Sequence, residues 1–304
     1  MIKRIIADCL PDKLYLSLMF HREMGYWMDW NNPKTFNEKL QWLKLYNRKP
    51  EYTIMADKVK AKEWVAERIG SEYIIPTLGV WDAPDDIDFD KLPNQFVLKC
   101  NHNSGLGMYI CKDKSKMDVE AVKQGLREGL NENYYLHGRE WPYKDVPRKI
   151  LAEQFMVNEA DEVGRAIRDN RELADYKFFC FDGEPYYCQV IRNRSTEETI
   201  DIYDMEWNHQ PFVGLNPEVK NGSVPVPCPP HINKMKEICR CLAKDIPFVR
   251  VDLYVINERE YFGELTFFPM QGMGRFTPDE WNEKIGDLIH LPDDSLIHRG
   301  GGKL

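Results

Sequence analysis

The alternation of apolar and polar positions is most regular in the C-terminal third of the chain, where it predicts a β-hairpin. The predicted elements are a Val- and Tyr-rich strand over 248–256, a turn over 257–259 and a returning strand over 260–267. Because side chains alternate between the two faces of a strand, Arg250 and Asp252 share one face. Pairing of the strands about this turn brings Glu264 beside Asp252.

Two neighbouring carboxylates in an apolar sheet repel each other and lose hydration, so they require a counter-charge. Mg²⁺ is a suitable one because it prefers hard oxygen ligands and usually bridges to phosphates. Arg250 on the same face offers a planar fork of donors for an oxyanion. The alternative is an ordinary hairpin with charged residues on its surface, and the pattern alone leaves both interpretations open.

A second candidate site follows the strand predicted over 95–100. That strand ends with Lys99 and leads into a small-residue loop with Ser104, Gly105 and Gly107, after which a short strand is predicted over 108–111. Backbone N–H groups of such a loop can approach a polyphosphate closely because glycine has no Cβ, and Lys99 adds a positive charge. No GK[ST] sequence follows, so this is not a Walker loop, and an ordinary tight connection remains the alternative.

Other segments have helical or strand patterns of their own. Helices are predicted over 12–24, 36–46, 57–68, 118–130, 231–244 and from 278 onward, the second of them after a Thr35–Glu38 capping box. Strands are predicted over 150–156, 174–181 and 185–191, the last two as a hairpin about Asp182-Gly183. The segments 131–149 and 200–230 are predicted to be irregular coverings.

These strands carry three further candidates. Glu153 lies on the first strand, Lys177 lies on the first arm of the hairpin, and Arg192 follows its second arm. Arginine near the end of a sheet suits capture of phosphate or carboxylate, which makes Arg192 a second candidate catalytic residue beside Arg250. The alternative for Arg192 is a solvated edge.

Composition narrows the class of protein. The chain has 304 residues, 43% of them hydrophobic and 30% charged, which is typical of a globular protein with a sizeable core. A net charge of −8 does not favour a general nucleic-acid surface. No apolar run is long enough for a membrane span, and the first residues do not resemble a secretory signal. The eight cysteines form no CxxC pair, which favours reduced thiols in a cytoplasm over a zinc site.

Four segments in order carry a resemblance to a known family: PKTFNEKLQWLKLY at 33–46, ADKVKAKEWVAERIG at 56–70, FVLKCNHNSGLG at 96–107, and VRVDLYV with GELTFFPMQGM at 249–273. The chain resembles the TupA-like ATP-grasp family of bacterial polysaccharide and teichuronopeptide gene clusters, long labelled as glycosyltransferases. The resemblance implies an α+β ATP-grasp fold. It also implies a helical N-terminal segment over 1–50, a lid subdomain with the phosphate loop over 51–152, and a C-terminal subdomain with the metal site over 153–304.

The resemblance also implies roles for the candidates. Lys99 is similar to the lysine at the nucleotide phosphates, and Ser104, Gly105 and Gly107 resemble the flexible loop over them. Glu153 is similar in place to the acid near the adenine or ribose, and Lys177 to a second lysine on the nucleotide side. Asp252 and Glu264 resemble the Mg²⁺ carboxylates, and Arg250 resembles the arginine that holds the acyl phosphate. Thr266 stands where the third metal ligand is commonly Asn, so metal binding there is expected to be weaker or through water.

The implied enzyme is a ligase that uses ATP and Mg²⁺ to join a carboxylate to an amine through an acyl phosphate. Its expected substrates are a uronic acid of a cell-surface polysaccharide and an amino acid or other amine, and its expected place is the bacterial cytoplasm, in peripheral contact with membrane-associated assembly machinery. Two alternatives remain: a glycosyltransferase of capsule or O-antigen synthesis, for which only Asp88-Phe89-Asp90 offers a metal motif, and a nucleotide-binding assembly protein without catalysis. The substrates and the oligomeric state stay open.

Overall fold

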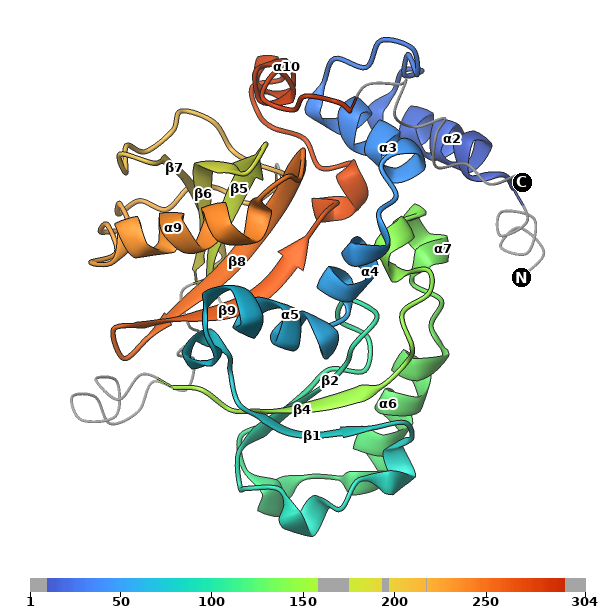
Figure 1. Cartoon of the computed structure of the whole chain (residues 1–304), viewed down its shortest axis with the longest axis vertical. Helices are drawn as coiled ribbons and strands as arrows, with labels where there is room; N and C mark the ends of the chain where they lie inside the picture. The colour runs from blue at the N-terminus through green and yellow to red at the C-terminus, as the bar shows by residue number, and fades with distance from the viewer. Residues whose placement is uncertain (1–9, 158–174, 193–196, 217, 293–304) are drawn as a thin grey trace.

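The computed structural model describes residues 10–157, 175–192, 197–216 and 218–292, which form two antiparallel sheets with helices around them (Figure 1). The smaller sheet has the order β1-β4-β2-β3, made of β1 Thr77–Trp81, β4 Ile150–Gln154, β2 Phe96–Cys100 and β3 Tyr109–Cys111. The larger sheet has the order β7-β6-β5-β8-β9, made of β7 Thr199–Asp204, β6 Glu184–Arg192, β5 Asp175–Phe181, β8 Phe248–Ile256 and β9 Arg259–Thr266. The predicted α+β class is confirmed.

Helices precede, join and flank the sheets. They are α2 Asp12–Met24, α3 Phe36–Tyr46, α4 Pro50–Ala56, α5 Lys60–Ile69, α6 Val119–Asn131, α7 Tyr135–Gly138, α9 Ile232–Ala243 and α10 Glu280–Gly286. The 3₁₀ turns are η1 Ser71–Tyr73, η2 Pro84–Asp86, η3 Phe89–Lys91, η4 Lys114–Lys116, η5 Trp141–Tyr143 and η6 Pro269–Gly272. The capping box predicted for Thr35 and Glu38 is present at the start of α3, where each side chain accepts from the other residue's backbone N–H.

Helix α9 covers one face of the larger sheet (Figure 1). Its buried apolar residues recur every three or four positions: Met235, Ile238, Cys239 and Leu242. They join Val251 of β8 in the largest hydrophobic cluster. Arg250 and Asp252 alternate with Val251, so both lie on the face of the sheet that α9 does not cover.

Helix α6 covers one face of the smaller sheet in the same way. Its Val122 and Leu126 pack with Phe96 and Leu98 of β2 in a second hydrophobic cluster. Because Phe96 and Leu98 point toward α6, Lys99 between Leu98 and the next buried position points to the opposite face. That face of the smaller sheet is turned toward β9 and the helices α4 and α5 (Figure 1).

The region between α3 and β1 differs from the prediction. The sequence pattern ends a helix before Pro50 and predicts one helix over 57–68, whereas the structure has α4 beginning at Pro50 and α5 beginning at Lys60. Proline is favoured at the first helical position, because the N–H that it lacks has no partner there anyway. The break between the two helices leaves Lys58 outside both of them.

Several contacts connect residues on either side of the expected subdomain boundaries. Tyr52 and Val65, from α4 and α5, belong to the hydrophobic cluster of the larger sheet, although both lie in the range 51–152 expected for the lid. Strand β4 crosses the expected boundary after residue 152, since Glu153 pairs within the smaller sheet. Strand β7 lies in the region predicted to be irregular over 200–230, where it forms the edge of the larger sheet.

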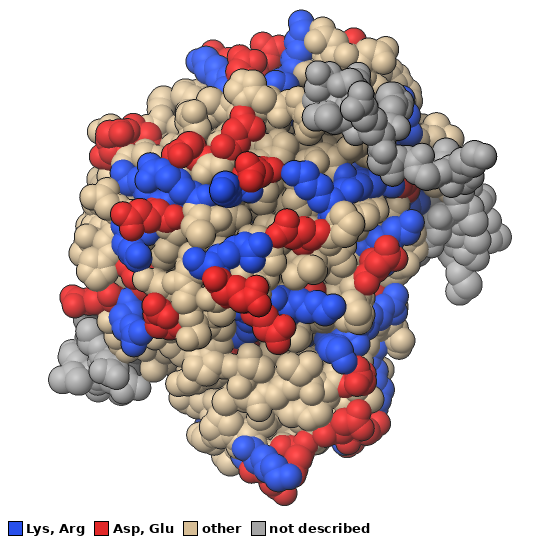
Figure 2. All heavy atoms as spheres, in the orientation of Figure 1, with Lys and Arg blue, Asp and Glu red and all other residues tan. Residues whose placement is uncertain are grey.

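Acidic and basic side chains are interspersed over the face of the molecule seen in Figure 2, without a large area of one sign. Within the described ranges, no helix has the length and apolar character that crossing a membrane requires.

Candidate active site

Three candidate residues form one row across the larger sheet. The backbone register pairs Lys177 of β5 with Asp252 of β8, and Asp252 with Glu264 of β9. The hairpin reaches this register differently from the prediction, because its turn has two residues, Asn257 and Glu258, both with positive φ. A two-residue turn alone would place Glu264 on the other face. A bulge at Gly263 inserts the residue that restores its place beside Asp252.

Arg250 binds the carboxylates of this row directly. Its Nε donates to Asp252 Oδ1 at 2.6 Å and its Nη2 to Asp252 Oδ2 at 2.7 Å, which is a bidentate pair. The same Nη2 donates to Glu264 Oε1 and to Thr266 Oγ1, each at 3.1 Å. Lys177 forms ion pairs with Asp252 and, at 2.8 Å, with Asp175. The described structure therefore holds the predicted metal ligands around a guanidinium group.

Burial and neighbouring cations set the charge of the two carboxyl groups. Burial raises the pKa of Asp252, which is 1% exposed, while Arg250 and Lys177 oppose this by pairing with its charged form. Around Glu264, burial acts in the same direction, but the cations outweigh it, Lys177 first, and lower the pKa from 4.5 to about 2. The Glu264 side chain is 41% exposed, so it is the carboxylate of the pair that a ligand can reach.

The smaller sheet contributes a second group of charges. Glu153 of β4 is buried between two lysines, with Lys62 Nζ at 2.5 Å and Lys99 Nζ in a second ion pair. Burial raises the pKa of Glu153, but Lys99 and Lys62 reverse the effect and hold it below its usual value. The register explains this arrangement, because Lys99 and Glu153 lie diagonally on one face of the paired strands β2 and β4.

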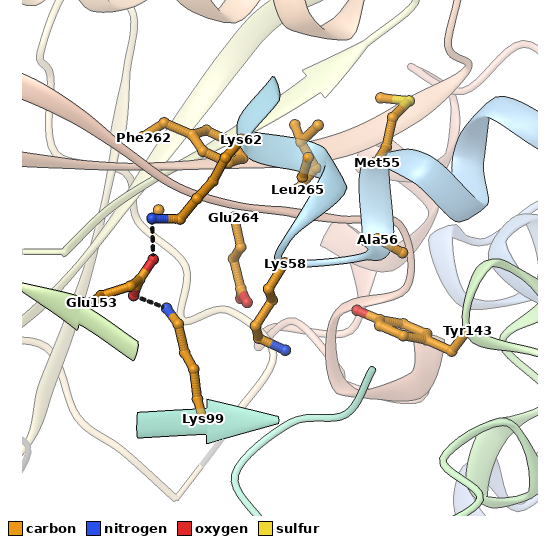
Figure 3. A pocket seen from close by; sticks show the side chains of 12 residues that line it. Met55, Ala56, Lys58, Lys62, Lys99, Tyr143, Glu153, Phe262, Glu264 and Leu265 are labelled. Atoms are coloured by element: carbon orange, nitrogen blue, oxygen red, sulfur yellow. Dashed lines mark ion pairs between the residues drawn. The ribbon is translucent and has the colours of Figure 1, made fainter. Parts of the chain in front are cut away.

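Glu264 of the first group and the charged residues of the second group line one cavity, which Figure 3 shows from close by. Its lining comes from both sheets and from the helices between them: Met55, Ala56, Lys58, Ala61, Lys62, Lys99, Tyr143, Glu153, Phe262, Gly263, Glu264 and Leu265. Lys58 and Tyr143 point into it although the sequence analysis assigned them no role. Lys58 donates to the carbonyl of Asn103, and burial lowers its pKa while Glu264 opposes the shift. The sequence pattern gives no signal for Lys58, because the break between α4 and α5 that contains it is apparent only in the structure.

The predicted phosphate loop is placed differently. Gly105 and Gly107 have φ of +89° and +75°, as glycine permits, and Ser104 is exposed, but none of the three lines the cavity. Instead, Gly107 packs on Gly129 of α6, and Asn103 Nδ2 donates to Glu132 Oε2 at 2.7 Å. The loop therefore rests against α6, and Lys58 of the cavity binds it through the carbonyl of Asn103.

This packing predicts that alanine substitution of two glycines on α6 changes the unfolding free energy in opposite directions. A Cβ at Gly129 would lie 2.8 Å from Gly107 Cα and 2.7 Å from Cys100 Sγ, so Gly129→Ala is expected to displace the loop and lower the unfolding free energy by about 1–3 kcal/mol. A Cβ at Gly125 meets nothing within 4 Å, so Gly125→Ala is expected to raise it by up to about 1 kcal/mol. Urea denaturation of both variants measures this, and equal effects would contradict the contact.

Arg192 is not brought to the cavity. It forms an ion pair with Asp201 at 2.9 Å and donates to Val224 O at 2.8 Å. A bulge between Phe179 and Cys180 shifts the β5–β6 register by one residue, so Gln189 pairs with Lys177. Without the bulge, Arg192 would share the face of Lys177; with it, Arg192 lies on the α9 face. The prediction that Arg192 acts with Arg250 is therefore corrected.

Charged side chains from both antiparallel sheets line one cavity, Lys99 and Glu153 from the smaller sheet and Glu264 from the larger one, and Lys58 and Lys62 join them from the helical region of α4 and α5. The model of the family described as TupA-like ATPgrasp matches residues 38–290. The chain therefore belongs to the TupA-like ATP-grasp family, and the predicted family and fold are confirmed. No curated protein matches the sequence.

Several solved structures have a similar fold. D-alanine–D-alanine ligase from Bacillus anthracis complexed with ATP is 15% identical with a TM-score of 0.43, over 78% of this chain and 63% of that chain. The corresponding ligase from Helicobacter pylori is 12% identical with a TM-score of 0.44, over 84% and 69%. The ATP-grasp ligase PsnB complexed with minimal precursor, Mg and ADP is 10% identical with a TM-score of 0.39, over 76% and 57%. This chain spans 63% of the length of the first of these ligases.

Proposed function

We propose that the chain is an ATP-dependent ligase that joins a carboxylate to an amine. The observation that carries the proposal is a cavity lined by Lys58, Lys62 and Lys99 and by Glu264, which the larger sheet pairs with Asp252. ATP and Mg²⁺ are the cofactors of an ATP-grasp enzyme, and membership of the family extends that expectation to this chain.

The nucleotide is proposed to bind between the sheets. Lys99 and Lys58 supply positive charge for its phosphates, since a lysine ammonium acts as a compact point charge. Glu153 is held on the same face of the smaller sheet by Lys62 and accepts hydrogen bonds from ribose or base. Val97, which the register places on the same face as Lys99, adds an apolar surface for the base.

The side-chain oxygens on β8 and β9 are of the type that Mg²⁺ prefers as ligands. Mg²⁺ usually takes one or two carboxylates together with waters and substrate phosphates, and Asp252 and Glu264 supply that number. In the described ranges, no larger group of His, Cys, Asp or Glu is placed to hold a metal. Glu264 and the Thr266 hydroxyl are the accessible oxygens, whereas both Asp252 oxygens accept from Arg250. When bound, the ion neutralises charge on the transferred phosphoryl group.

The proposed reaction has two steps. A carboxylate oxygen of the substrate forms a bond to the γ-phosphorus as the bond to ADP breaks, and the amine nitrogen then bonds to the carbonyl carbon as phosphate leaves and a proton is released. Arg250 stabilises the charge on the phosphoryl group in both steps, and no covalent bond to the protein is needed. The family resemblance favours a uronic acid of a cell-surface polysaccharide as the carboxylate, modified in the cytoplasm, at the membrane face where such polymers are assembled.

The described structure does not support the glycosyltransferase alternative. Asp88 caps the turn η3, where it accepts from the backbone of Asp90 and pairs with Lys91, and none of these three residues lines the cavity. Release of ADP, measured by a coupled assay over a panel of uronic acids with amino acids as amines, tests the ligase. Sugar transfer from a UDP-sugar without ADP release from ATP would overturn it.

Lys99→Ala is expected to raise the KM for ATP by about 10- to 100-fold, because a hydrogen bond to a charged group contributes about 1.5–3 kcal/mol. Its ammonium faces the cavity, so the loss falls on nucleotide binding. Lys91→Ala is the matched control, because the Lys91 side chain is 84% exposed and pairs with Asp88 on the same subdomain. Steady-state ADP release at varied ATP concentration gives the KM for ATP of both variants. An unchanged KM in Lys99→Ala would contradict the role of Lys99 in binding the phosphates.

A further inference from the structure

A groove of about 440 Å³ lies between helix α2, the loop around residue 215 and the segment that follows β9. Its volume falls in the range of about 300–1,000 Å³ that is usual for small-molecule sites. The groove is distinct from the cavity between the two sheets, since the two share no lining residue. Its lining combines apolar, amide and charged side chains, among them Met19, Met270, Met273, Gln271 and Arg275.

The backbone that lines this groove is strained. Nine non-glycine residues of the described ranges have positive φ, and three of them line the groove: Leu215 at 63°, Met270 at 51° and Gln271 at 56°. Such residues persist only where their surroundings hold them, and they gather at active sites and ligand clamps. Met270 is 58% exposed, so burial of its side chain does not offset the strain. The strain therefore indicates a site at which a ligand is held.

Helix α3 holds the strained segment from the opposite side with three polar side chains. Their donors bind backbone carbonyls of the segment: Asn37 Nδ2 binds Gly274 O at 2.6 Å, Gln41 Nε2 binds Gly272 O at 3.0 Å, and Lys44 Nζ binds Gln271 O at 2.7 Å. All three side chains are 0% exposed, at positions where an amphipathic helix normally has apolar residues. The fold thus fixes the shape of the groove wall with buried hydrogen bonds.

Arg275 is the cation of the groove that has no carboxylate partner. It is partly exposed, and its Nη2 donates to the backbone carbonyl of Glu23 at 2.7 Å. Among the described residues it forms no ion pair, whereas Arg22 donates through Nε to Glu23 Oε1 at 2.7 Å. A guanidinium group offers a planar fork of donors that matches a carboxylate. Arg275 is therefore placed to bind a carboxylate that a ligand brings.

The other side chains of the groove narrow the chemistry of that ligand. The Glu218 carboxylate, which forms no ion pair within the described ranges, accepts hydrogen bonds from hydroxyl groups. Met19 and Met273 offer flexible apolar surface for the C–H face of a ring. A carboxylate, several hydroxyl groups and a C–H face occur together in a uronic acid unit.

The groove adjoins the metal-bearing hairpin along the chain. Met270 lies four residues after Thr266, which is at most about 14 Å even for an extended backbone. A short chain of sugar units spans such a distance. A ligand in the groove can therefore be part of the same molecule that presents its carboxylate near Glu264.

We propose that the groove binds a uronic acid unit next to the one that reacts, with the Arg275 guanidinium on the carboxylate of the bound unit. The inference rests on the proposed ligase function and deepens it, because it makes the substrate a chain of acidic sugars rather than a single uronic acid. The strained turn then has a task, since it holds Met270 and Gln271 at the groove and close to the hairpin.

The test is a calorimetric titration of trigalacturonic acid into the nucleotide-free protein. The wild-type chain is expected to bind it, and Arg275→Ala is expected to raise the Kd at least about 10-fold, because charge-assisted hydrogen bonds are lost. Arg148→Ala is the matched control, since Arg148 also binds one backbone carbonyl, Leu130 O at 2.9 Å, and lies outside the groove. Its Kd should stay within about 2-fold of the wild-type value.

Met270→Glu decides the question where Arg275→Ala does not fold, because position 270 is exposed. The added carboxylate repels the bound one, so the Kd should rise, whereas Met270→Gln has a similar size without the charge and should bind nearly as the wild-type chain does. The neutral methyl ester of trigalacturonic acid and the acidic peptide triglutamate are both expected to bind at least about 10-fold more weakly than trigalacturonic acid.

The proposal is overturned if the wild-type chain does not bind trigalacturonic acid or binds triglutamate equally well. An unchanged Kd in both Arg275→Ala and Met270→Glu would overturn it as well. Failure of the proposed function is a separate result, since it would appear as absence of ADP release by the wild-type chain, whereas this titration requires neither ATP nor turnover.

Discussion

Glu264→Gln is expected to lower kcat for ADP release by about 10²- to 10³-fold while lowering the unfolding free energy less than Asp252→Asn does. The variant removes the charge of the accessible carboxylate, on which the proposed metal ion depends. The cations that lower the pKa of Glu264 also stabilise the fold through its charge, but its side chain is 41% exposed and Arg250 keeps its bidentate partner Asp252, so the loss of stability is the smaller of the two. Steady-state kinetics at saturating ATP and Mg²⁺, together with urea denaturation, measure the two quantities.

Asp252→Asn, in the same row of the sheet, is expected to behave differently. Asp252 is 1% exposed and is the shared partner of Arg250 and Lys177, so the variant leaves two cations poorly paired. Breaking a buried ion pair costs about 3–5 kcal/mol, and turnover falls as well. Glu260→Gln on β9 is the control, because Glu260 pairs with His231 outside the cavity and its loss should keep turnover. Full turnover in Glu264→Gln would remove the metal assignment.

The sequence predicts the central hairpin well because its pattern is local. The strand predicted over 248–256 is β8 Phe248–Ile256, and the predicted neighbours Asp252 and Glu264 are paired. The agreement has an unexpected cause, since a shorter turn and the bulge at Gly263 give the same register as the longer turn that the sequence analysis assumed. Alternation identifies which residues share a face, but a bulge decides which residues of neighbouring strands meet.

An unpredicted bulge also explains why the structure places Arg192 away from the cavity. Its predicted role requires the unbroken register of a two-residue turn, and one extra residue at Phe179–Cys180 moves it to the face that α9 covers. Nothing in the local pattern of apolar and polar residues indicates that bulge. The signal that was available is Asp201, which offers Arg192 a buried carboxylate on the neighbouring strand β7, a strand that the sequence analysis did not predict.

The pattern of apolar and polar residues does not identify the functional or buried lysines of the helical region. Lys58 lies in the break between α4 and α5, and that break became visible only because α4 begins at Pro50. Lys44 is a buried lysine on a side of α3 that also buries Asn37 and Gln41, and a helical pattern by itself gives no reason for it. Its partners belong to the segment after β9, more than two hundred residues away along the chain, so only the tertiary structure explains the choice of lysine.

Arg250→Ala is expected to change turnover and metal binding in opposite directions. Arg250 is proposed to stabilise the phosphoryl group in transfer, so its loss should lower kcat by about 10²- to 10³-fold. In the described structure the same guanidinium binds Asp252 and Glu264, the proposed metal ligands, and so competes with the ion for them. Without it, Asp252 keeps Lys177 as a direct cationic partner, Glu264 loses the ion pair with Arg250, and the mutual repulsion of the two close carboxylates favours a divalent cation.

The measurement is a calorimetric titration of Mg²⁺ into nucleotide-free protein, which does not depend on activity. Arg250→Ala is expected to bind Mg²⁺ more tightly than the wild-type chain, whereas Arg240→Ala, which removes an exposed arginine of α9 paired with Glu184, should bind it equally. Weaker binding in Arg250→Ala would contradict the competition, because it would mean that the arginine holds the carboxylates in place for the ion. Tighter binding with lost turnover would mean that the arginine must leave the carboxylates before the metal and the nucleotide can share the site.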